Sequence, residues 1–355
     1  MAMMNWSIDN QRVLIWTSAI SAHGQAADIV LGQSDMNTNT RNSGGISDTS
    51  LSNPYDVAAT GSKLLVADNL NGRINIWNTI PTAHNTAADV VYGQIDHSKA
   101  GFQGEMTAKS LNQPVSVSTD GTKLFVADTT NGRVKIWNTI PTSAGPNVAA
   151  DIAIGQTNLV ATLPVGLAST RLNYPNAAVS NGTKLLVVDS VNSRVFIYNT
   201  IPTASNTAAD LVLGQPTLSV NTINNGGLSA SSLSLPRSIA ISGTKLIVAD
   251  TSNNRVLIWN SIPTANNTAA DVVLGQPDMT SSTLNNGGVS AATLFLPRGV
   301  AVLGSKLVVA DTNNSRVLIW NSICYIWTIK CDSSIQQHFW IEWVDRAGSE
   351  SRHHS

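Results

Sequence analysis

Short apolar runs separated by polar turns follow one another along the chain, and one such run recurs six times. Each copy is a turn, an arginine and an apolar run that ends in an aromatic residue, as in Asn-Gly-Arg-Val-Lys-Ile-Trp. The six arginines are Arg12, Arg73, Arg133, Arg194, Arg255 and Arg316. Successive residue numbers differ by 61, 60, 61, 61 and 61. This constant spacing is an internal repeat, and it indicates a repeat-built architecture.

Residues 233–290 show the pattern within one repeat. A short apolar strand begins near Pro236, at the strand start, where the missing N–H of proline costs least. Strands rich in β-branched residues are predicted at 245–250 and 255–259, and a fourth strand at 270–276. These runs are too short for a helical period, so each repeat is expected to hold four antiparallel strands.

Four-stranded units repeated around a ring form a β-propeller, and we expect six blades of about 61 residues each. We name the strands A to D from the inside outward. A β-solenoid, the structural rival, normally repeats at shorter periods. A six-bladed ring needs 24 strands, and 21 are recognisable from the repeated motifs. One D, one A and one B strand are missing, so the last blade is expected to be irregular or incomplete.

The repeats define one expected propeller domain over residues 9–323. The chain begins with a partial blade at 9–50, and the repeats follow at about 51–110, 111–171, 172–232, 233–293 and 294–323. Residues 324–355 share no motif with the repeats and are rich in tryptophan and histidine, with Trp327, His338, Trp340 and Trp343. Our hypothesis is that this tail is an out-of-frame or truncated ending. A continuing Leu-x-x-Pro repeat in another reading frame of the coding DNA would support it.

Composition removes several classes of function. Charged residues make up 12% of the chain and the net charge is −1, with no basic cluster that could bind nucleic acid. No apolar run is long enough to insert into a membrane. The sequence as written begins without a basic segment and apolar core, so no signal peptide is expected. Both cysteines, Cys324 and Cys331, lie in the tail, so the repeats are expected to fold without disulfides.

An aspartate precedes each of the last five repeat arginines by five residues. The pairs are Asp68–Arg73, Asp128–Arg133, Asp189–Arg194, Asp250–Arg255 and Asp311–Arg316. Each pair flanks a four-residue turn, so the two side chains should lie opposite each other across the B–C hairpin. Because the pair recurs in every repeat, we interpret it as structural and not as a ligand site.

Candidate ligand-binding residues are those that differ between repeats. In successive repeats the residue after the strand-A proline is Tyr55, Val115, Asn176, Arg237 or Arg298. The position after that also varies, and in the first of these repeats it is Asp56. Strand A is innermost, so these positions should surround the mouth of a central channel. Two arginines with Tyr55, Asp56 and Asn176 are suited to hold an anion or a sugar-like polar ligand.

Signals for catalysis and metal binding are weak. The histidines form no metal-ligand spacing, and the sequence has no nucleophile elbow, phosphate loop or dinucleotide fingerprint. Asp56 and Asn176 alone do not make a calcium site. We therefore predict no catalytic residues, no metal ligands and no cofactor.

The motif Val-Ala-Asp-Thr-x-Asn-x-Arg-Val-x-Ile-Trp, preceded by Leu-x-x-Pro, resembles the repeats of NHL propellers. The Ala-Ala-Asp-Val-Val-Leu-Gly-Gln-Pro link is similar to that of the bacterial, secreted branch of this family. The resemblance covers residues 9–323 and implies the propeller fold. It also implies an extracellular or cell-envelope location. Family members range from protein- and RNA-binding modules to lyases and hydrolases, so the resemblance does not select an activity.

Together these features predict a non-enzymatic, monomeric scaffold that binds a protein or a small polar or anionic ligand. The alternative is a propeller-type hydrolase or lyase that uses a metal, calcium or zinc, in the central channel. A stoichiometric bound metal would favour the enzyme. An RNA-binding module is a third hypothesis, and it predicts salt-sensitive RNA affinity that the charge composition gives no reason to expect.

Overall fold

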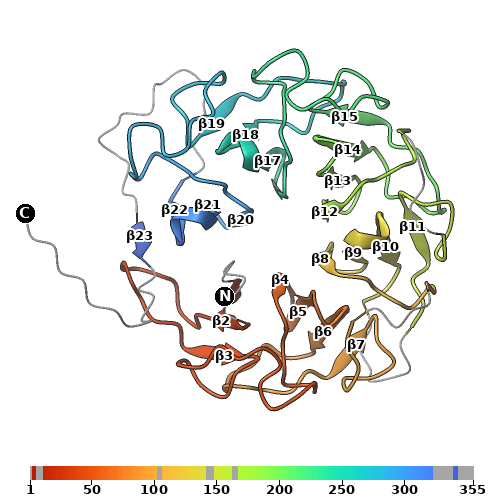
Figure 1. The fold of residues 1–355 in the computed structure, drawn as a ribbon, viewed down its shortest axis with the longest axis vertical. Helices are drawn as coiled ribbons and strands as arrows, with labels where there is room; N and C mark the ends of the chain where they lie inside the picture. The colour runs from red at the N-terminus through yellow and green to blue at the C-terminus, as the bar shows by residue number, and fades with distance from the viewer. Residues whose placement is uncertain are drawn as a thin grey trace, which may run out of the picture.

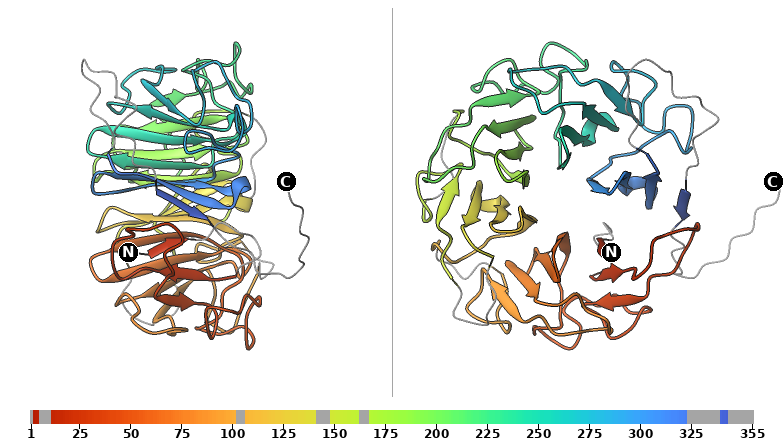
Figure 2. Two further views of the ribbon diagram at one scale, coloured as in Figure 1. Left: turned by 90° about the vertical axis from the view of Figure 1, so that its left-hand side faces the viewer. Right: turned by 180° about the vertical axis from the view of Figure 1, so that it is seen from behind.

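The computed structural model of the protein describes residues 2–4, 11–101, 106–140, 148–161, 167–322 and 339–342. In this part of the chain, antiparallel β-sheets follow one another around a central axis and form a ring (Figure 1). From the side, the strands run roughly along this axis (Figure 2). The described residues otherwise contain loops and three 3₁₀ turns, Thr129–Asn131, Thr251–Asn253 and Thr312–Asn314.

Five sheets have four strands each, and we number them as blades 1 to 5. Blade 1 holds β4 (Pro54–Thr60), β5 (Lys63–Asp68), β6 (Arg73–Trp77) and β7 (Val90–Tyr92). Blade 2 holds β8 (Pro114–Thr119), β9 (Leu124–Asp128), β10 (Arg133–Trp137) and β11 (Ile152–Ile154). Blade 3 holds β12 (Pro175–Ser180), β13 (Leu185–Asp189), β14 (Arg194–Tyr198) and β15 (Leu211–Leu213).

The remaining strands complete the ring. Blade 4 holds β16 (Ser238–Ser242), β17 (Lys245–Asp250), β18 (Arg255–Trp259) and β19 (Val272–Leu274). Blade 5 holds β20 (Gly299–Leu303), β21 (Lys306–Asp311), β22 (Arg316–Trp320) and β23 (Phe339–Glu342). The three-stranded sheet holds β1 (Ala2–Met4), β2 (Val13–Ile15) and β3 (Ile29–Leu31).

The prediction of six four-stranded blades is wrong. The described residues form five such blades, and the sheet between blades 5 and 1 has only three strands, in the order β1–β2–β3. β2 and β3 occupy the C and D positions, and β1 pairs with the inner side of β2. β23 pairs with the outer side of β22, so it completes blade 5 and leaves the three-stranded sheet without a fourth strand.

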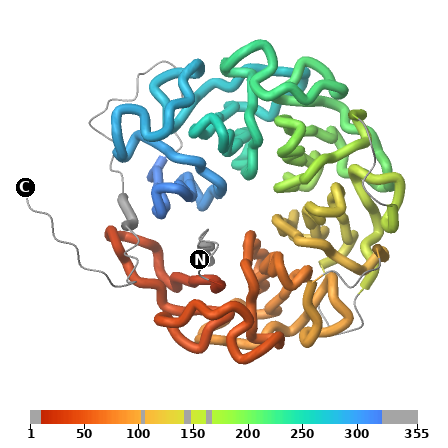
Figure 3. The backbone as a smooth tube through the Cα atoms, in the orientation of Figure 1, coloured from red at the N-terminus to blue at the C-terminus, as the bar shows by residue number. Residues whose placement is uncertain are grey.

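The two ends of the described chain therefore lie in different sheets. β1 lies near the axis of the ring beside β4, whereas β23 lies at the outer edge of blade 5 (Figure 1). The backbone tube shows the blades between them following one another around the ring (Figure 3). Of the tail, the structure describes only residues 339–342. The hypothesis about the origin of residues 324–355 concerns Cys324, Cys331 and other residues outside the described part.

The core consists of apolar layers between neighbouring sheets. Phe125 and Val134 of blade 2, for example, pack against Leu185 and Val187 of blade 3. The C strands β6, β10, β14 and β18 are buried at every position, because each has a neighbouring blade on both faces. Blade 5 closes onto the three-stranded sheet through a smaller described cluster that contains Leu14, Trp16 and Ile319.

The A strands β4, β8, β12, β16 and β20 lie innermost and next to one another around the axis (Figure 1). Each follows a long D–A loop that crosses one end of the ring. The described part of the chain contains no helix long and apolar enough to span a membrane.

Candidate functional site

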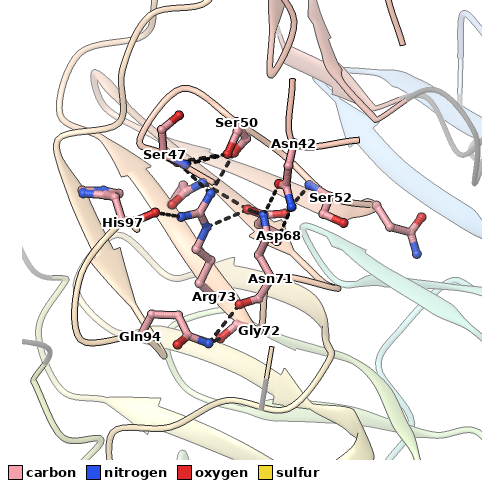
Figure 4. Close-up of polar contacts among 12 residues, drawn as sticks. Asn42, Ser47, Ser50, Ser52, Asp68, Asn71, Gly72, Arg73, Gln94 and His97 are labelled. Carbon is pink, nitrogen blue, oxygen red and sulfur yellow. Dashed lines mark hydrogen bonds and ion pairs between the residues drawn. The ribbon is translucent and has the colours of Figure 1, made fainter. Parts of the chain in front are cut away.

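In blades 1 to 4 an arginine at the start of the C strand connects three separate segments of backbone, and Figure 4 shows it for blade 1. In blade 1, Nε of Arg73 donates to Oδ2 of Asp68 at 2.7 Å across the B–C hairpin. Nη1 donates to the carbonyl of His97 at 2.6 Å, in the loop after the blade. Nη2 donates to the carbonyls of Ser47 and Ser50 at 2.9 and 2.8 Å, in the loop before it. One guanidinium therefore joins the hairpin to both D–A loops.

The same ion pair is present in all five blades. The Nε–Oδ2 distances run from 2.6 to 2.8 Å, and the side chains are completely or almost completely buried. In each blade an asparagine of the turn also donates to the aspartate, and the five are Asn71, Asn131, Asn192, Asn253 and Asn314. Burial raises the pKa of Asp68, while Arg73 and Asn71 act in the opposite direction. Because all three nitrogens of the Arg73 guanidinium are engaged inside the protein, none is directed at a ligand.

Lys135 in β10 was missed by the sequence analysis. It is completely buried, and its ammonium donates to the carbonyls of Thr107, Ala108 and Ser110 at 3.1, 3.0 and 2.6 Å. In blade 2, Nη2 of Arg133 reaches the carbonyl of Ser110 only at 3.5 Å. Lys135 therefore takes over the loop contacts that the arginine makes in other blades. Burial lowers its pKa to about 7.

The position after the strand-A proline is set apart from the rest of the strand. In blades 1 to 3 it is the extra residue of a β-bulge: Tyr55, Val115 or Asn176. In blades 4 and 5 the residues at this position, Arg237 and Arg298, donate their backbone N–H to Ala249 and Ala310, both at 3.1 Å. A bulge redirects the side chain that it carries, so in blades 1 to 3 this variable residue is aimed differently from its neighbours.

Arg237 and Arg298 are the two predicted residues that the structure brings together most clearly. Burial lowers the pKa of Arg237, the charge of Arg298 lowers it further, and Tyr55 opposes these effects. Arg298 occupies the equivalent position of the neighbouring blade, whose innermost strand β20 contacts β16. Blade 1, which carries Tyr55, lies on the opposite side of the ring from blade 4 (Figure 1). The electrostatic influence of Tyr55 on Arg237 therefore acts across the axis.

These two arginines differ from the C-strand arginines of the five complete blades in having no carboxylate partner within the described residues. The five ion pairs found there all belong to the hairpins. Nε of Arg298 is shielded from solvent and has no hydrogen-bond partner in the described part of the chain. Two neighbouring positive charges near the axis are therefore uncompensated by any described carboxylate.

Asp56 and Asn176 have other contacts. The Asp56 carboxylate accepts the N–H of Val57 at 2.9 Å and the N–H of Val117, in the next blade, at 3.0 Å. It also bonds to the side chain of Ser116, and burial raises its pKa to about 6. The Asn176 side chain is buried and donates to the carbonyl of Tyr174 at 3.5 Å. Asp56 thus connects two innermost strands, a role that the sequence analysis did not foresee.

No group of three or more histidine, cysteine, aspartate or glutamate side chains is arranged to hold a metal among the residues described. The repeated strand-D aspartates likewise have backbone partners. In each case Oδ2 accepts, at 2.7 Å, the N–H of the residue that follows the aromatic end of strand C. The arginine pair near the axis is therefore the feature that the repeat pattern leaves unexplained.

A ring of radially arranged antiparallel sheets, with its innermost strands around a common axis, defines the protein as a β-propeller. No family model matches the chain, and no curated protein matches its sequence.

The chain is similar to two solved structures. The nidogen/laminin complex has 13% sequence identity, a TM-score of 0.43, and a match covering 76% of this chain and 75% of that one. A putative 6-phosphogluconolactonase from Bacteroides fragilis has 12% identity, a TM-score of 0.42, and a match covering 78% and 82%. At these identities the likeness concerns the fold alone.

Proposed function

We propose that this propeller is a non-enzymatic binding scaffold of the NHL-repeat type, located outside the cytoplasm or at the cell envelope. The end of the axis where the A strands begin binds a small anionic ligand. Arg237 and Arg298 supply the charge, and Tyr55 supplies a hydroxyl from the opposite side of the ring. The observation that carries the proposal is this partly buried arginine pair, which has no described carboxylate partner, whereas the C-strand arginines of the five complete blades are all paired with aspartates.

Partial desolvation of the two guanidinium groups favours the binding of an anion between them. A buried or half-buried positive charge without a counterion is costly, and two neighbouring charges also repel each other. A carboxylate or phosphate between the two guanidinium groups would accept charge-assisted hydrogen bonds and remove the repulsion. Such an anion would also give Nε of Arg298 a partner.

Isothermal titration calorimetry with inorganic phosphate tests the proposal. We expect saturable binding to the wild-type protein at constant ionic strength. The double variant Arg237→Gln/Arg298→Gln should lose at least about tenfold in affinity, because each charge-assisted hydrogen bond contributes about 1.5–3 kcal/mol. The control is Arg41→Gln, which removes the charge of an exposed loop arginine. Phosphate binding that is equal in all three proteins would refute the proposed site.

Metal analysis of the purified protein distinguishes the enzyme alternative. The scaffold proposal predicts no stoichiometric calcium or zinc after gel filtration in metal-free buffer. A bound metal at one equivalent, lost together with an activity on addition of a chelator, would favour a propeller-type hydrolase or lyase.

A further inference from the structure

The residue before the strand-A proline has the same unusual backbone conformation in every complete blade. These residues are Asn53, Gln113, Tyr174, Leu235 and Leu296, with φ values of 54°, 51°, 52°, 45° and 47°. All five lie in the left-handed region. Because position and conformation are shared, their side chains leave the backbone in equivalent directions around the axis. We call these five residues the axial rim.

The axial rim is polar on one side of the ring and apolar on the other. Asn53 and Gln113 belong to blades 1 and 2, whereas Tyr174, Leu235 and Leu296 belong to the consecutive blades 3, 4 and 5. Asparagine adopts a left-handed conformation readily, but leucine and tyrosine do so rarely. The left-handed backbone conformation therefore does not explain why leucine and tyrosine stand at these positions.

These apolar side chains do not contribute to the described core. Tyr174 is 43% exposed. Leu235 and Leu296 are half-buried, and neither packs against any of the described core clusters. Their conformation is held by hydrogen bonds from their own N–H groups to the Ser193 hydroxyl at 3.2 Å and the Asn254 carboxamide oxygen at 2.9 Å. The fold thus keeps two leucines at the rim without burying them.

The apolar half of the axial rim adjoins the arginine pair. A single proline separates Leu235 from Arg237 and Leu296 from Arg298. The same two blades therefore carry both the positive charges without a described carboxylate partner and the half-buried leucines of the rim. The opposite side of the ring offers Asn53 and Gln113 at the rim.

We propose that the ligand is an amphipathic organic anion. Its charged group binds Arg237 and Arg298, and its apolar body lies against Leu235, Leu296 and Tyr174. The inference rests on the proposed anion-binding function and adds the chemical class of the ligand. Charge complementarity positions the charged group of the ligand at the two arginines. The apolar residues on one side of the axial rim position its apolar body.

A series of straight-chain carboxylates tests this inference. We expect acetate, butyrate, hexanoate and octanoate to bind with affinity that rises about three- to fourfold for each methylene that is buried. Hexylammonium, which has the same apolar body and the opposite charge, should bind at least tenfold more weakly than hexanoate. Calorimetry at constant ionic strength measures the whole series.

Two variants identify the surface involved. Leu235→Asn/Leu296→Asn places at the rim the residue that blade 1 already has there, so the left-handed backbone is retained. This variant should bind acetate as the wild type does, but with a flatter dependence on chain length. Leu303→Asn is the matched control, because Leu303 is 45% exposed at the other end of β20. It should leave the chain-length dependence unchanged.

The outcomes separate the two proposals. If phosphate and acetate bind in an arginine-dependent way but longer carboxylates gain nothing, anion binding stands and the amphipathic ligand is refuted. The inference also fails if the rim variant keeps the wild-type chain-length dependence, or if hexylammonium binds as tightly as hexanoate. If no anion binds through Arg237 and Arg298, both proposals fail.

Discussion

Asp56 is a carboxylate whose two oxygens connect neighbouring innermost strands. The N–H groups of Val57 and Val117 both donate to it, but burial outweighs these bonds and raises its pKa to about 6. The folded protein therefore binds a proton at Asp56 more tightly than the unfolded chain does. The stability that this proton provides is complete below about pH 4 and is lost as the pH rises through about 6.

The variant Asp56→Asn tests this linkage. Asparagine resembles the protonated acid and does not titrate, so the variant should gain on the wild type as the pH rises from 4 to 7. The expected relative gain in the free energy of unfolding is about 2 kcal/mol, following from a shift of about two pKa units. Urea denaturation at both pH values measures it, with the exposed Asp35→Asn as the control. A constant difference between variant and wild type over this range would contradict the burial argument.

The residues of the candidate site differ in how far they could be predicted from the sequence. Arg237, Arg298 and Tyr55 were identifiable because they interrupt a repeat. The electrostatic influence of Tyr55 on Arg237 could not be predicted, because it depends on the width of the ring. Lys135 could have been identified by aligning the repeats, because it is the only charged residue at its position. At its position the other five repeats have Leu14, Asn75, Phe196, Leu257 and Leu318.

At the scale of one element, the B–C hairpin depends on its buried ion pair. Arg255 donates to Asp250 at 2.8 Å, to the carbonyl of Met279 at 2.6 Å, and to the carbonyls of Ser229 and Ser232, both at 2.9 Å. The sequence spacing predicts an aspartate opposite this arginine. It does not predict the loop carbonyls, because these are distant in the sequence. Two lie 26 and 23 residues before Arg255, and one lies 24 residues after it.

Arg255→Met should destabilise the protein strongly. The substitution leaves Asp250 buried without its counterion and three carbonyls without a donor, and breaking such a pair costs about 3–5 kcal/mol. The same change at Arg12 is the internal comparison, because the residue five positions before Arg12 is Ser7 instead of aspartate. We expect a smaller loss there in thermal and urea denaturation. Equal losses at the two sites would show that the carboxylate contributes little.

At the scale of the whole molecule, periodicity predicts repeated four-stranded sheets but not how the ring ends. The repeat continues from blade to blade because each motif recurs about every 61 residues. At the ends the motif is absent, so the sequence offered no way to assign β1 and β23. The structure places them in different sheets, and no sheet of the described chain combines strands from both ends.

The seam between blade 5 and the three-stranded sheet should therefore open before the rest of the ring. In the described chain its apolar layer, which contains Leu14, Trp16 and Ile319, is smaller than the layers between the other neighbouring sheets. Hydrogen exchange measured by mass spectrometry should show faster exchange in β2, β3 and β22 than in β9 and β13.

Two matched variants sharpen this prediction. Ile319→Ala at the seam should accelerate exchange in β2 and β3, whereas Ile258→Ala, at the same strand position in blade 4, should not do so selectively. Each substitution removes buried side-chain volume and costs about 2–5 kcal/mol. If all sheets exchange in one transition in both variants, the seam is as stable as the other layers.

The central claim is that the arginine pair near the axis is a binding site. A crystal of the protein soaked in selenate, an anion that scatters anomalously, tests this claim directly. We expect an anomalous peak within hydrogen-bonding distance of both the Arg237 and Arg298 guanidinium groups, and no such peak in the Arg237→Gln/Arg298→Gln variant. Selenate bound only at exposed surface residues, with both guanidinium groups unoccupied, would contradict it.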